Sequence, residues 1–137
     1  MGDRRKRDTV TVYRLGKRYT FDAAHHLPGL PAGHKCARQH GHTYTVEVIL
    51  TADGLVPPGF VTDFGDLGPF ADYIHAALDH RDLNTILDFE PTSEALATHL
   101  AGWFINNLEP AIPGRLLAVR VWETPTSWAE YRVEERM

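Results

Sequence analysis

Two stretches of alternating apolar residues, separated by a long loop, constrain the fold of this chain most. In residues 9–21 four large apolar side chains fall at odd positions, and in residues 43–50 four fall at even positions. A period of two places one face of an extended strand against a core, so both stretches predict strands. These positions are Tyr13, Leu15, Tyr19 and Phe21, and then Tyr44, Val46, Val48 and Leu50. The loop at residues 27–35 is rich in proline and glycine and long enough to indicate a functional segment.

Helical spacing dominates the middle of the chain. A short strand at 60–62 precedes a helix for which Asp66 is the expected cap, with Pro69 tolerated in the first turn. A second helix is expected to begin at the start signal in residues 91–94. The helical apolar positions are Leu67, Phe70, Ala71, Ile74 and Leu78, and then Leu96, Leu100, Trp103, Phe104 and Leu108. Further strands are expected at 116–123 and, after a turn, at 128–134.

The predicted order of elements is two strands, two helices and two strands (ββααββ). This order predicts an α+β fold with a four-stranded antiparallel sheet and both helices on one face. The chain has 137 residues, which is enough for one domain, expected at 9–137 after a disordered basic arm at 1–8. Such a sheet has two edges, and exposed edges favour pairing with another copy of the chain, so we expect an oligomer.

Charge and hydropathy narrow the class of function. The net charge of -4 argues against general nucleic-acid binding, because a polyanion needs a basic surface. The basic run Arg4, Arg5, Lys6 and Arg7 is expected to be a solvated arm, with an RNA or membrane tether as the alternative. No apolar stretch is long enough to span a membrane and no secretion signal is evident, so a cytoplasmic protein is expected.

Three histidines form the candidate metal site. His40 and His42 are two residues apart on an extended strand, so their imidazoles point the same way from alpha carbons about 6.6 Å apart. His25, at the end of the preceding strand, supplies a third imidazole. Three neutral imidazoles with an open fourth position are typical of catalytic zinc. The alternative for each histidine alone is an ordinary hydrogen-bonded residue.

Cys36 is the single cysteine and lies four residues before His40. One interpretation makes it a fourth zinc ligand, which would close a structural site. The other makes it a reactive thiolate that acts as base or nucleophile, and Lys35 and Arg38 nearby favour this interpretation.

Two further acidic positions carry candidate chemistry. Asp79 precedes His80, and a carboxylate beside an imidazole can orient it and stabilise its charged form, although such a pair is more often a helix-end arrangement. Glu123 lies where a strand meets a turn, as an exposed acid or as an acceptor for an amidine-like group of a ligand.

Together these segments resemble the 6-pyruvoyl-tetrahydropterin synthase superfamily over about residues 19–131. Cys36, with three residues between it and His40, is similar to the carboxy-forming branch of that family and unlike the branch that replaces the cysteine with glutamate. The matching motifs are Phe-Asp-Ala-Ala-His-His-Leu-Pro at 21–28, Gly-His-Lys-Cys-Ala-Arg-Gln-His-Gly-His at 33–42, Asp63-Phe64, Leu78-Asp79-His80, Leu83-Asn84, Pro-Thr-Ser-Glu at 91–94, and Glu123-Thr124.

The resemblance implies the tunnelling fold (T-fold), in which subunits join edge to edge into stacked rings, typically a hexamer, with active sites between subunits. It implies a zinc-dependent lyase that converts 7,8-dihydroneopterin triphosphate to 6-carboxy-5,6,7,8-tetrahydropterin, acetaldehyde and triphosphate. Such a product feeds 7-deazaguanine compounds, either queuosine or a related nucleoside. The alternatives are a pyruvoyl-forming enzyme and a non-catalytic zinc-binding protein.

The resemblance also implies a role for each candidate residue. Zinc would be held by His25, His40 and His42. Catalysis would use Cys36, Asp79, His80 and Glu123, and the substrate would be bound by Glu123, Thr124, Lys35 and Arg38. The turn after Thr124 departs from the family pattern, because the bulky Trp128 follows it and either narrows the pterin pocket or packs beneath it.

Overall fold

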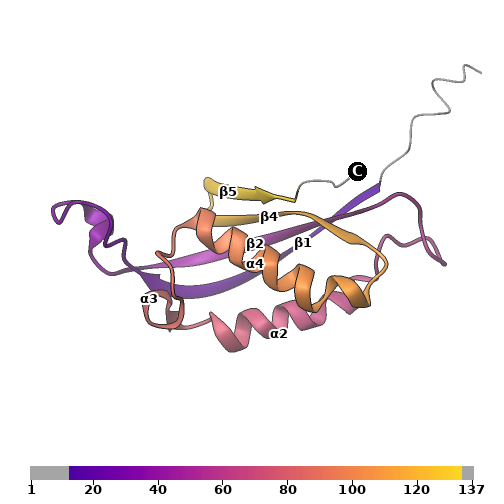
Figure 1. The fold of residues 1–137 in the computed structure, drawn as a ribbon, viewed down its shortest axis with the longest axis horizontal. Helices are drawn as coiled ribbons and strands as arrows, with labels where there is room; N and C mark the ends of the chain where they lie inside the picture. Colours follow the sequence, from indigo (N-terminus) through magenta and orange to yellow (C-terminus); the bar gives the residue numbers. More distant parts are fainter. Residues whose placement is uncertain (1–12, 134–137) are drawn as a thin grey trace, which may run out of the picture.

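The computed structural model describes residues 13–133 as one sheet with helices on one side (Figure 1). The basic arm and positions 9–12 lie outside the described residues. The order of strands across the sheet is β3-β1-β2-β4-β5. The strands are β1 (Tyr13–His25), β2 (His40–Ala52), β3 (Arg81–Asp82), β4 (Arg115–Thr124) and β5 (Ser127–Arg132).

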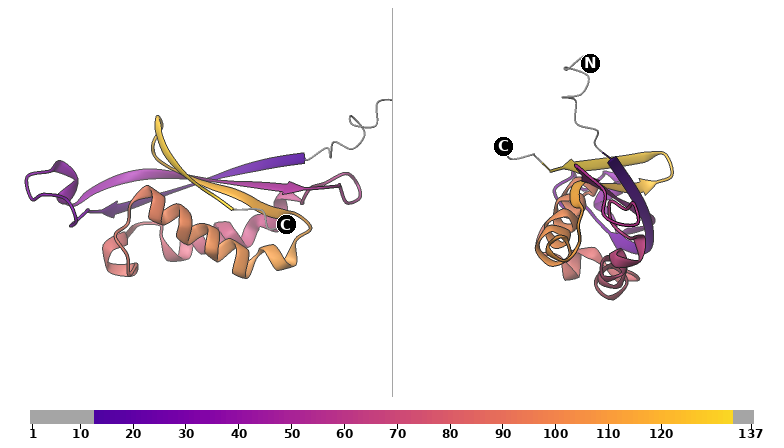
Figure 2. Two further views of the ribbon diagram at one scale, coloured as in Figure 1. Left: turned by 45° about the horizontal axis from the view of Figure 1, so that its top comes forward. Right: turned by 90° about the vertical axis from the view of Figure 1, so that its right-hand side faces the viewer.

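Two long helices cover the same face of the sheet, as the turned views show (Figure 2). Shorter elements connect them to the strands. The helices are α2 (Gly68–Ala77), the short α3 (Leu83–Ile86) and α4 (Ser93–Asn107), with 3-10 turns η1 (Lys35–Ala37), η2 (Phe64–Leu67) and η3 (Glu109–Ala111). The predicted α+β class and the one-sided helix layer are confirmed. No helix among residues 13–133 is long and apolar enough to cross a membrane.

The sheet has five strands, where four antiparallel strands were expected. The extra strand β3 has two residues and runs parallel to β1, with Ala23 opposite Arg81. The backbone N–H of His80 donates to the carbonyl of Asp22 at 2.6 Å and begins this pairing. Two residues are too few to carry a period-two pattern, so the sequence did not reveal this strand.

Two local expectations about the segment before α2 were wrong. Asp66 does not cap α2, which has no side-chain cap and follows directly from the turn η2. That turn contains Asp66 and is capped by Asp63, whose side chain accepts from the N–H of Gly65. The expected strand at 60–62 is only an isolated bridge between Val56 and Phe60. The start of α4 was predicted correctly, because the Thr92 side chain accepts from the N–H of Ala95 and caps the helix.

The core lies between the helices and one face of the sheet. Phe21 and Tyr44 are cross-strand partners whose rings stack at 5.0 Å, and both are at most 2% exposed. Phe70 from α2 and Phe104 from α4 pack against this face and are fully buried. Burial of such side chains stabilises the fold by about 1.5–3 kcal/mol each, so packing fixes the register of β1 on β2.

The opposite face of the sheet carries a row of alternating charges. Arg18, Glu47, Arg120 and Glu130 are successive cross-strand partners on β1, β2, β4 and β5. Glu47 accepts from Arg18 at 2.9 Å and from Arg120 at 3.2 Å, and Arg120 also donates to Glu130 at 2.7 Å. Cross-strand pairs of opposite charge suit a sheet face that no helix covers.

Candidate metal centre and neighbouring groups

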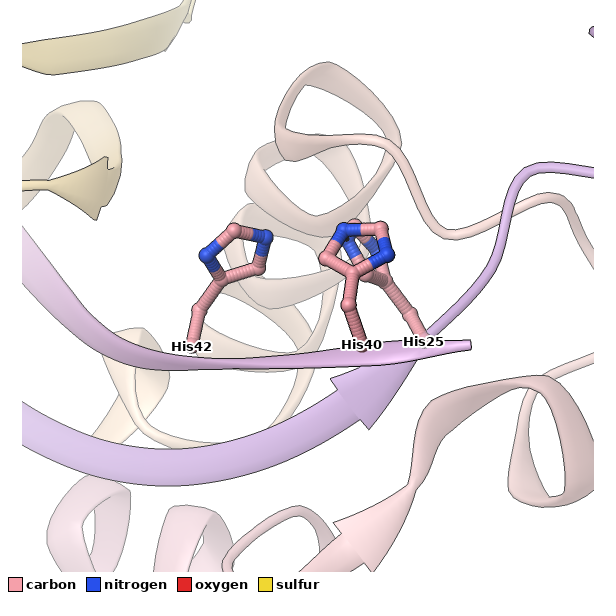
Figure 3. Close-up of side chains that lie close together, drawn as sticks. All are labelled: His25, His40 and His42. Atoms are coloured by element: carbon pink, nitrogen blue, oxygen red, sulfur yellow. Dashed lines mark hydrogen bonds between the residues drawn. The ribbon is translucent and has the colours of Figure 1, made fainter. Parts of the chain in front are cut away.

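The register of β1 on β2 brings three histidines together at one end of the sheet. His25 pairs directly with His40, and His42 lies two residues further along β2. Because side chains alternate along a strand, these three share the face of Phe21 and Tyr44. Figure 3 shows the three imidazoles leaving the strands on the same side. We call His25, His40 and His42 the triad.

The triad is compact enough to share one ion. The candidate ligand nitrogens all lie within 4.8 Å of one another, and the ring centroids are 4.5 to 5.1 Å apart. His25 is fully buried, whereas His40 and His42 are half-buried. The triad is therefore open on one side, as a catalytic metal site requires.

Backbone carbonyls orient two of the rings. The Nδ1 of His25 lies 2.8 Å from the carbonyl oxygen of Pro91, and the Nδ1 of His40 lies 2.8 Å from that of Arg38. A carbonyl oxygen only accepts, so both Nδ1 atoms carry the proton and donate. In a neutral imidazole the Nε2 atom is then a bare lone pair, which is the form that binds metal.

These lone pairs lack a partner within the described chain. The Nε2 atoms of His25 and His40 face each other at 2.9 Å, and the Nε2 of His42 is buried without a hydrogen bond. Burial lowers the pKa of His25 and of His42 below the usual value, which opposes a bridging proton. A shared cation satisfies all three nitrogens at once, so the residues fit a metal ion.

Glu123 lies beside the triad. Its Oε1 is 3.5 Å from the Nε2 of His25 and 3.6 Å from that of His42. A register shift between Trp122 and Thr124 in β4 accompanies this placement. Burial raises the pKa of the Tyr44 hydroxyl, and the negative charge of the Glu123 carboxylate raises it further.

A hollow of about 580 Å³ adjoins Glu123 and the triad. Glu123, Thr124 and His42 line it together with the indole of Trp122, which sequence reasoning missed. Trp128 is absent from its lining among the described residues; it is half exposed, with the guanidinium of Arg120 4.9 Å from its ring centroid. The remaining lining residues are Arg18, Gly41, Thr43, Thr45 and Pro125.

Cys36 lies in the loop between β1 and β2, which projects beyond one end of the sheet (Figure 1). It is half-buried and belongs to none of the groups in residues 13–133 that could jointly hold a metal ion. This arrangement favours an open metal site over one closed by the thiolate. Lys35 and Arg38 flank Cys36, and their side chains are exposed.

Asp79 and His80, which we call the dyad, lie at the β3 edge of the sheet. The Oδ2 of Asp79 is 3.0 Å from the Nδ1 of His80, and its Oδ1 accepts from the N–H of Asp22 at 2.9 Å. The Asp22 N–H, and then His80, lower the pKa of Asp79. His80 has a positive φ of 58°, and 77% of its side chain is exposed. The dyad is therefore preorganised and faces outward.

The structure thus divides the predicted site residues between two places. Among the described residues the dyad has no hydrogen bond or ion pair with the triad, and its own partners are Asp22 and His75. The dyad and Asp22 form a second compact group. Sequence reasoning missed Asp22 and the carbonyl of Pro91, although both lie inside motifs that it recognised.

The fold and the triad define an α+β protein with a candidate metal centre at the end of its sheet. Residues 14–134 match the family model described as 6-pyruvoyl tetrahydropterin synthase. The chain belongs to this family.

Relatives of established name agree with that membership. The chain is 41% identical to 6-carboxy-5,6,7,8-tetrahydropterin synthase of Synechocystis sp. over 88% of this chain and 93% of the relative. It is 35% identical to the protein of the same name from Bacillus subtilis, over 88% and 85% of the two chains. It is also 34% identical to dihydroneopterin monophosphate aldolase of Pyrococcus furiosus, over 80% and 89%. These relatives are enzymes, and the prediction of an enzyme is confirmed.

Solved structures support the fold. An uncharacterized protein from Wolinella succinogenes superposes with a TM-score of 0.81 at 23% identity, over 90% of this chain and 99% of the other. The 6-pyruvoyl tetrahydropterin synthase of Caenorhabditis elegans gives a TM-score of 0.77 at 24% identity, over 91% and 98%. The predicted tunnelling fold is confirmed.

Proposed function

We propose that the chain is a zinc-dependent 6-carboxy-5,6,7,8-tetrahydropterin synthase. This lyase would convert 7,8-dihydroneopterin triphosphate to 6-carboxy-5,6,7,8-tetrahydropterin, acetaldehyde and triphosphate. The observation that carries the proposal is the triad, whose candidate ligand nitrogens lie within 4.8 Å of one another; the Nε2 of His42 is buried without a hydrogen bond. The names of the Synechocystis and Bacillus relatives support the substrate class.

Zinc is the proposed ion because three imidazoles with an open fourth position match its catalytic sites. Held by His25, His40 and His42, zinc would supply Lewis-acid chemistry, which would polarise the side-chain hydroxyls of the pterin substrate and make the adjacent carbon easier to deprotonate. The Pro91 and Arg38 carbonyls fix the rings of His25 and His40 for this purpose.

Residues around the triad supply binding and proton transfer in this proposal. Cys36 is the base that moves protons at the substrate side chain. Glu123, with Thr124, receives the guanidine-like edge of the pterin in the adjoining hollow and takes part in the proton relay. Lys35 and Arg38 attract the triphosphate, for which their exposed positive charge is the support.

The dyad is proposed to complete the active site of a neighbouring subunit. Asp79 orients His80, which returns a proton to the substrate. The exposure of His80, and the absence of a hydrogen bond or ion pair between the dyad and its own triad within residues 13–133, support this assignment. A homohexamer with active sites between subunits is the corresponding proposal for the assembly.

The direct test incubates the zinc-loaded protein with 7,8-dihydroneopterin triphosphate and follows acetaldehyde, triphosphate and pterin products. Release of acetaldehyde supports the proposal. Release of triphosphate without acetaldehyde identifies a pyruvoyl-forming enzyme, and no turnover identifies a non-catalytic zinc-binding protein. The product's place in 7-deazaguanine synthesis, whether for queuosine or another nucleoside, and the cytoplasmic location stay predictions.

A further inference from the structure

The loop that carries Cys36 is held by one short segment and by a histidine of the triad. Among residues 13–133, the Arg38 carbonyl accepts from His40, and the other side-chain hydrogen bonds that leave residues 26–39 go to residues 82–90. Asn84 accepts from the N–H of His26 and donates to its carbonyl, both at 2.9 Å. Glu90 accepts from the N–H of Gly29 at 2.6 Å, and Gln39 donates to Asp82 at 3.3 Å.

The Glu90 contact is the shortest of these and is made at Gly29, two residues after Leu27. The N–H of Leu27 donates to the carbonyl of Cys36 at 2.8 Å, so the stem at 27–29 and the cysteine move together. A hydrogen bond to a carboxylate is stronger than one to a neutral acceptor. Gly29 allows it, because a Cβ at this position would lie 2.7 Å from a Glu90 oxygen.

The residue after Glu90 orients the triad. The carbonyl of Pro91 accepts from the Nδ1 of His25 at 2.8 Å, and Pro91 is buried while Glu90 is exposed. One stretch of two residues therefore contacts both the metal-binding ring and the loop of the thiol. Pro91 is packed in the interior, and the side chain of Glu90 accepts a hydrogen bond from the loop.

We propose that Glu90 is a positioning residue that holds the loop of Cys36 in a fixed place relative to the triad. The catalytic part of this inference rests on the proposed function, whereas the positional part does not. Glu90 is exposed, so its loss removes little buried surface and should leave the thermal midpoint near that of the wild type. The effect is expected in the thiol and in turnover.

The chain offers a clean probe, because Cys36 is its only cysteine. Alkylation by iodoacetamide at fixed pH therefore reports on this loop alone. We expect Glu90→Ala to alkylate about tenfold faster than the wild type, since a freed loop exposes the thiol. Glu90→Gln keeps an acceptor oxygen and should stay within about threefold of the wild-type rate.

Asp88→Ala is the matched control. It removes an exposed carboxylate two residues earlier, one with no hydrogen bond to the loop, and should alkylate at the wild-type rate. An alkylation rate for Glu90→Ala equal to that of Asp88→Ala would overturn the proposal. Gly29→Ala supplies a second check, because its new Cβ displaces the Glu90 carboxylate. Its effect should vanish in a Glu90→Ala background, and simple additivity would contradict the contact.

Turnover separates this inference from the proposed function. With 7,8-dihydroneopterin triphosphate, Glu90→Ala should lower kcat about tenfold, which corresponds to one charged hydrogen bond, while zinc content and KM change little. Wild-type protein without turnover would defeat the proposed function but leave the alkylation result to decide on the positioning role. Full kcat in Glu90→Ala, or loss of zinc with it, would overturn the positioning role.

Discussion

The triad and the dyad are both imidazole sites, and they are built in opposite ways. The rings of the triad are half-buried or fully buried, and two of them are oriented by backbone carbonyls of their own chain. The dyad is oriented by a carboxylate and a strand backbone, and His80 faces solvent. The first arrangement leaves lone pairs available to an ion, whereas the second holds an oriented imidazole at the surface, where a substrate can reach it.

The difference teaches that one chain holds a candidate metal site whose rings are oriented from within the chain, and an exposed carboxylate–imidazole pair at a sheet edge. An ion would satisfy the nitrogens of the triad. The dyad has no hydrogen bond or ion pair with the triad among residues 13–133, and its exposed ring is open to a group from another chain. The two sites should therefore respond differently to substitution, to mixing of subunits and to pH.

Removal of a triad ligand should have the largest effect. His25→Ala is expected to lose bound zinc and to lower kcat/KM by more than about 100-fold, because loss of even the outer partners of a metal ligand costs about 10–100-fold. Metal analysis after gel filtration and steady-state kinetics measure both. His26→Ala is the neighbouring control and should keep the metal. Full zinc content in His25→Ala would remove this histidine from the site.

Removal of the thiol should separate metal binding from chemistry. Cys36→Ala is expected to keep one zinc per chain while turnover falls about 10²–10⁴-fold, the range of general base catalysis. Metal analysis beside an acetaldehyde assay measures the separation. Unchanged turnover would remove Cys36 from the proposed mechanism.

Removal of the dyad histidine should test whether it serves another chain. His80→Ala is expected to keep zinc and to lose about 10²-fold in turnover. The His80→Ala and Cys36→Ala variants are then unfolded, mixed in equal amounts and refolded together. The mixture should regain about a quarter of wild-type activity, because that fraction of sites in a random oligomer pairs an intact thiol with an intact histidine. No gain on mixing would place both groups in one chain.

The smallest expected effect is the pH dependence of stability in the zinc-free protein. His25 and His42 have lowered pKa values when folded, so below about pH 6.5 the unfolded chain binds protons that the folded chain does not. The thermal midpoint should therefore fall as the pH drops below that value. The pKa of Asp79 is also lowered from its ordinary value of 3.8, so this carboxyl adds to the loss only below about that pH. In the zinc-free His42→Gln variant the fall near pH 6 should be smaller, and an equal fall would assign it to other groups.

The triad could be predicted from the sequence because its geometry follows from strand periodicity. The two-residue spacing of His40 and His42 and the alternation around Phe21 and Tyr44 place the imidazoles on one face of adjoining strands. Packing of the same apolar residues fixes the register of β1 on β2, and this register places His25 directly opposite His40. Local patterns therefore sufficed for β1, β2, β4 and β5, for α4 and for the sheet face that carries the triad.

The rest depends on contacts between residues far apart in the chain. The carbonyl of Pro91 reaches His25 across 66 positions, and the N–H of Asp22 reaches Asp79 across 57. Every residue has the same backbone carbonyl, so the sequence does not indicate which carbonyl will orient an imidazole ring. The two-residue β3 and the Asp63 cap escaped prediction for a related reason, since each depends on a few bonds rather than on a repeated pattern.

Zinc K-edge X-ray absorption on wild-type protein and on Cys36→Ala tests the central claim most directly. The account predicts the same spectrum for both: three nitrogen ligands at about 2.0–2.1 Å, a light fourth ligand and no sulfur. A sulfur ligand at about 2.3 Å in the wild type that disappears in Cys36→Ala would contradict it. That result would make the thiol part of a closed structural site.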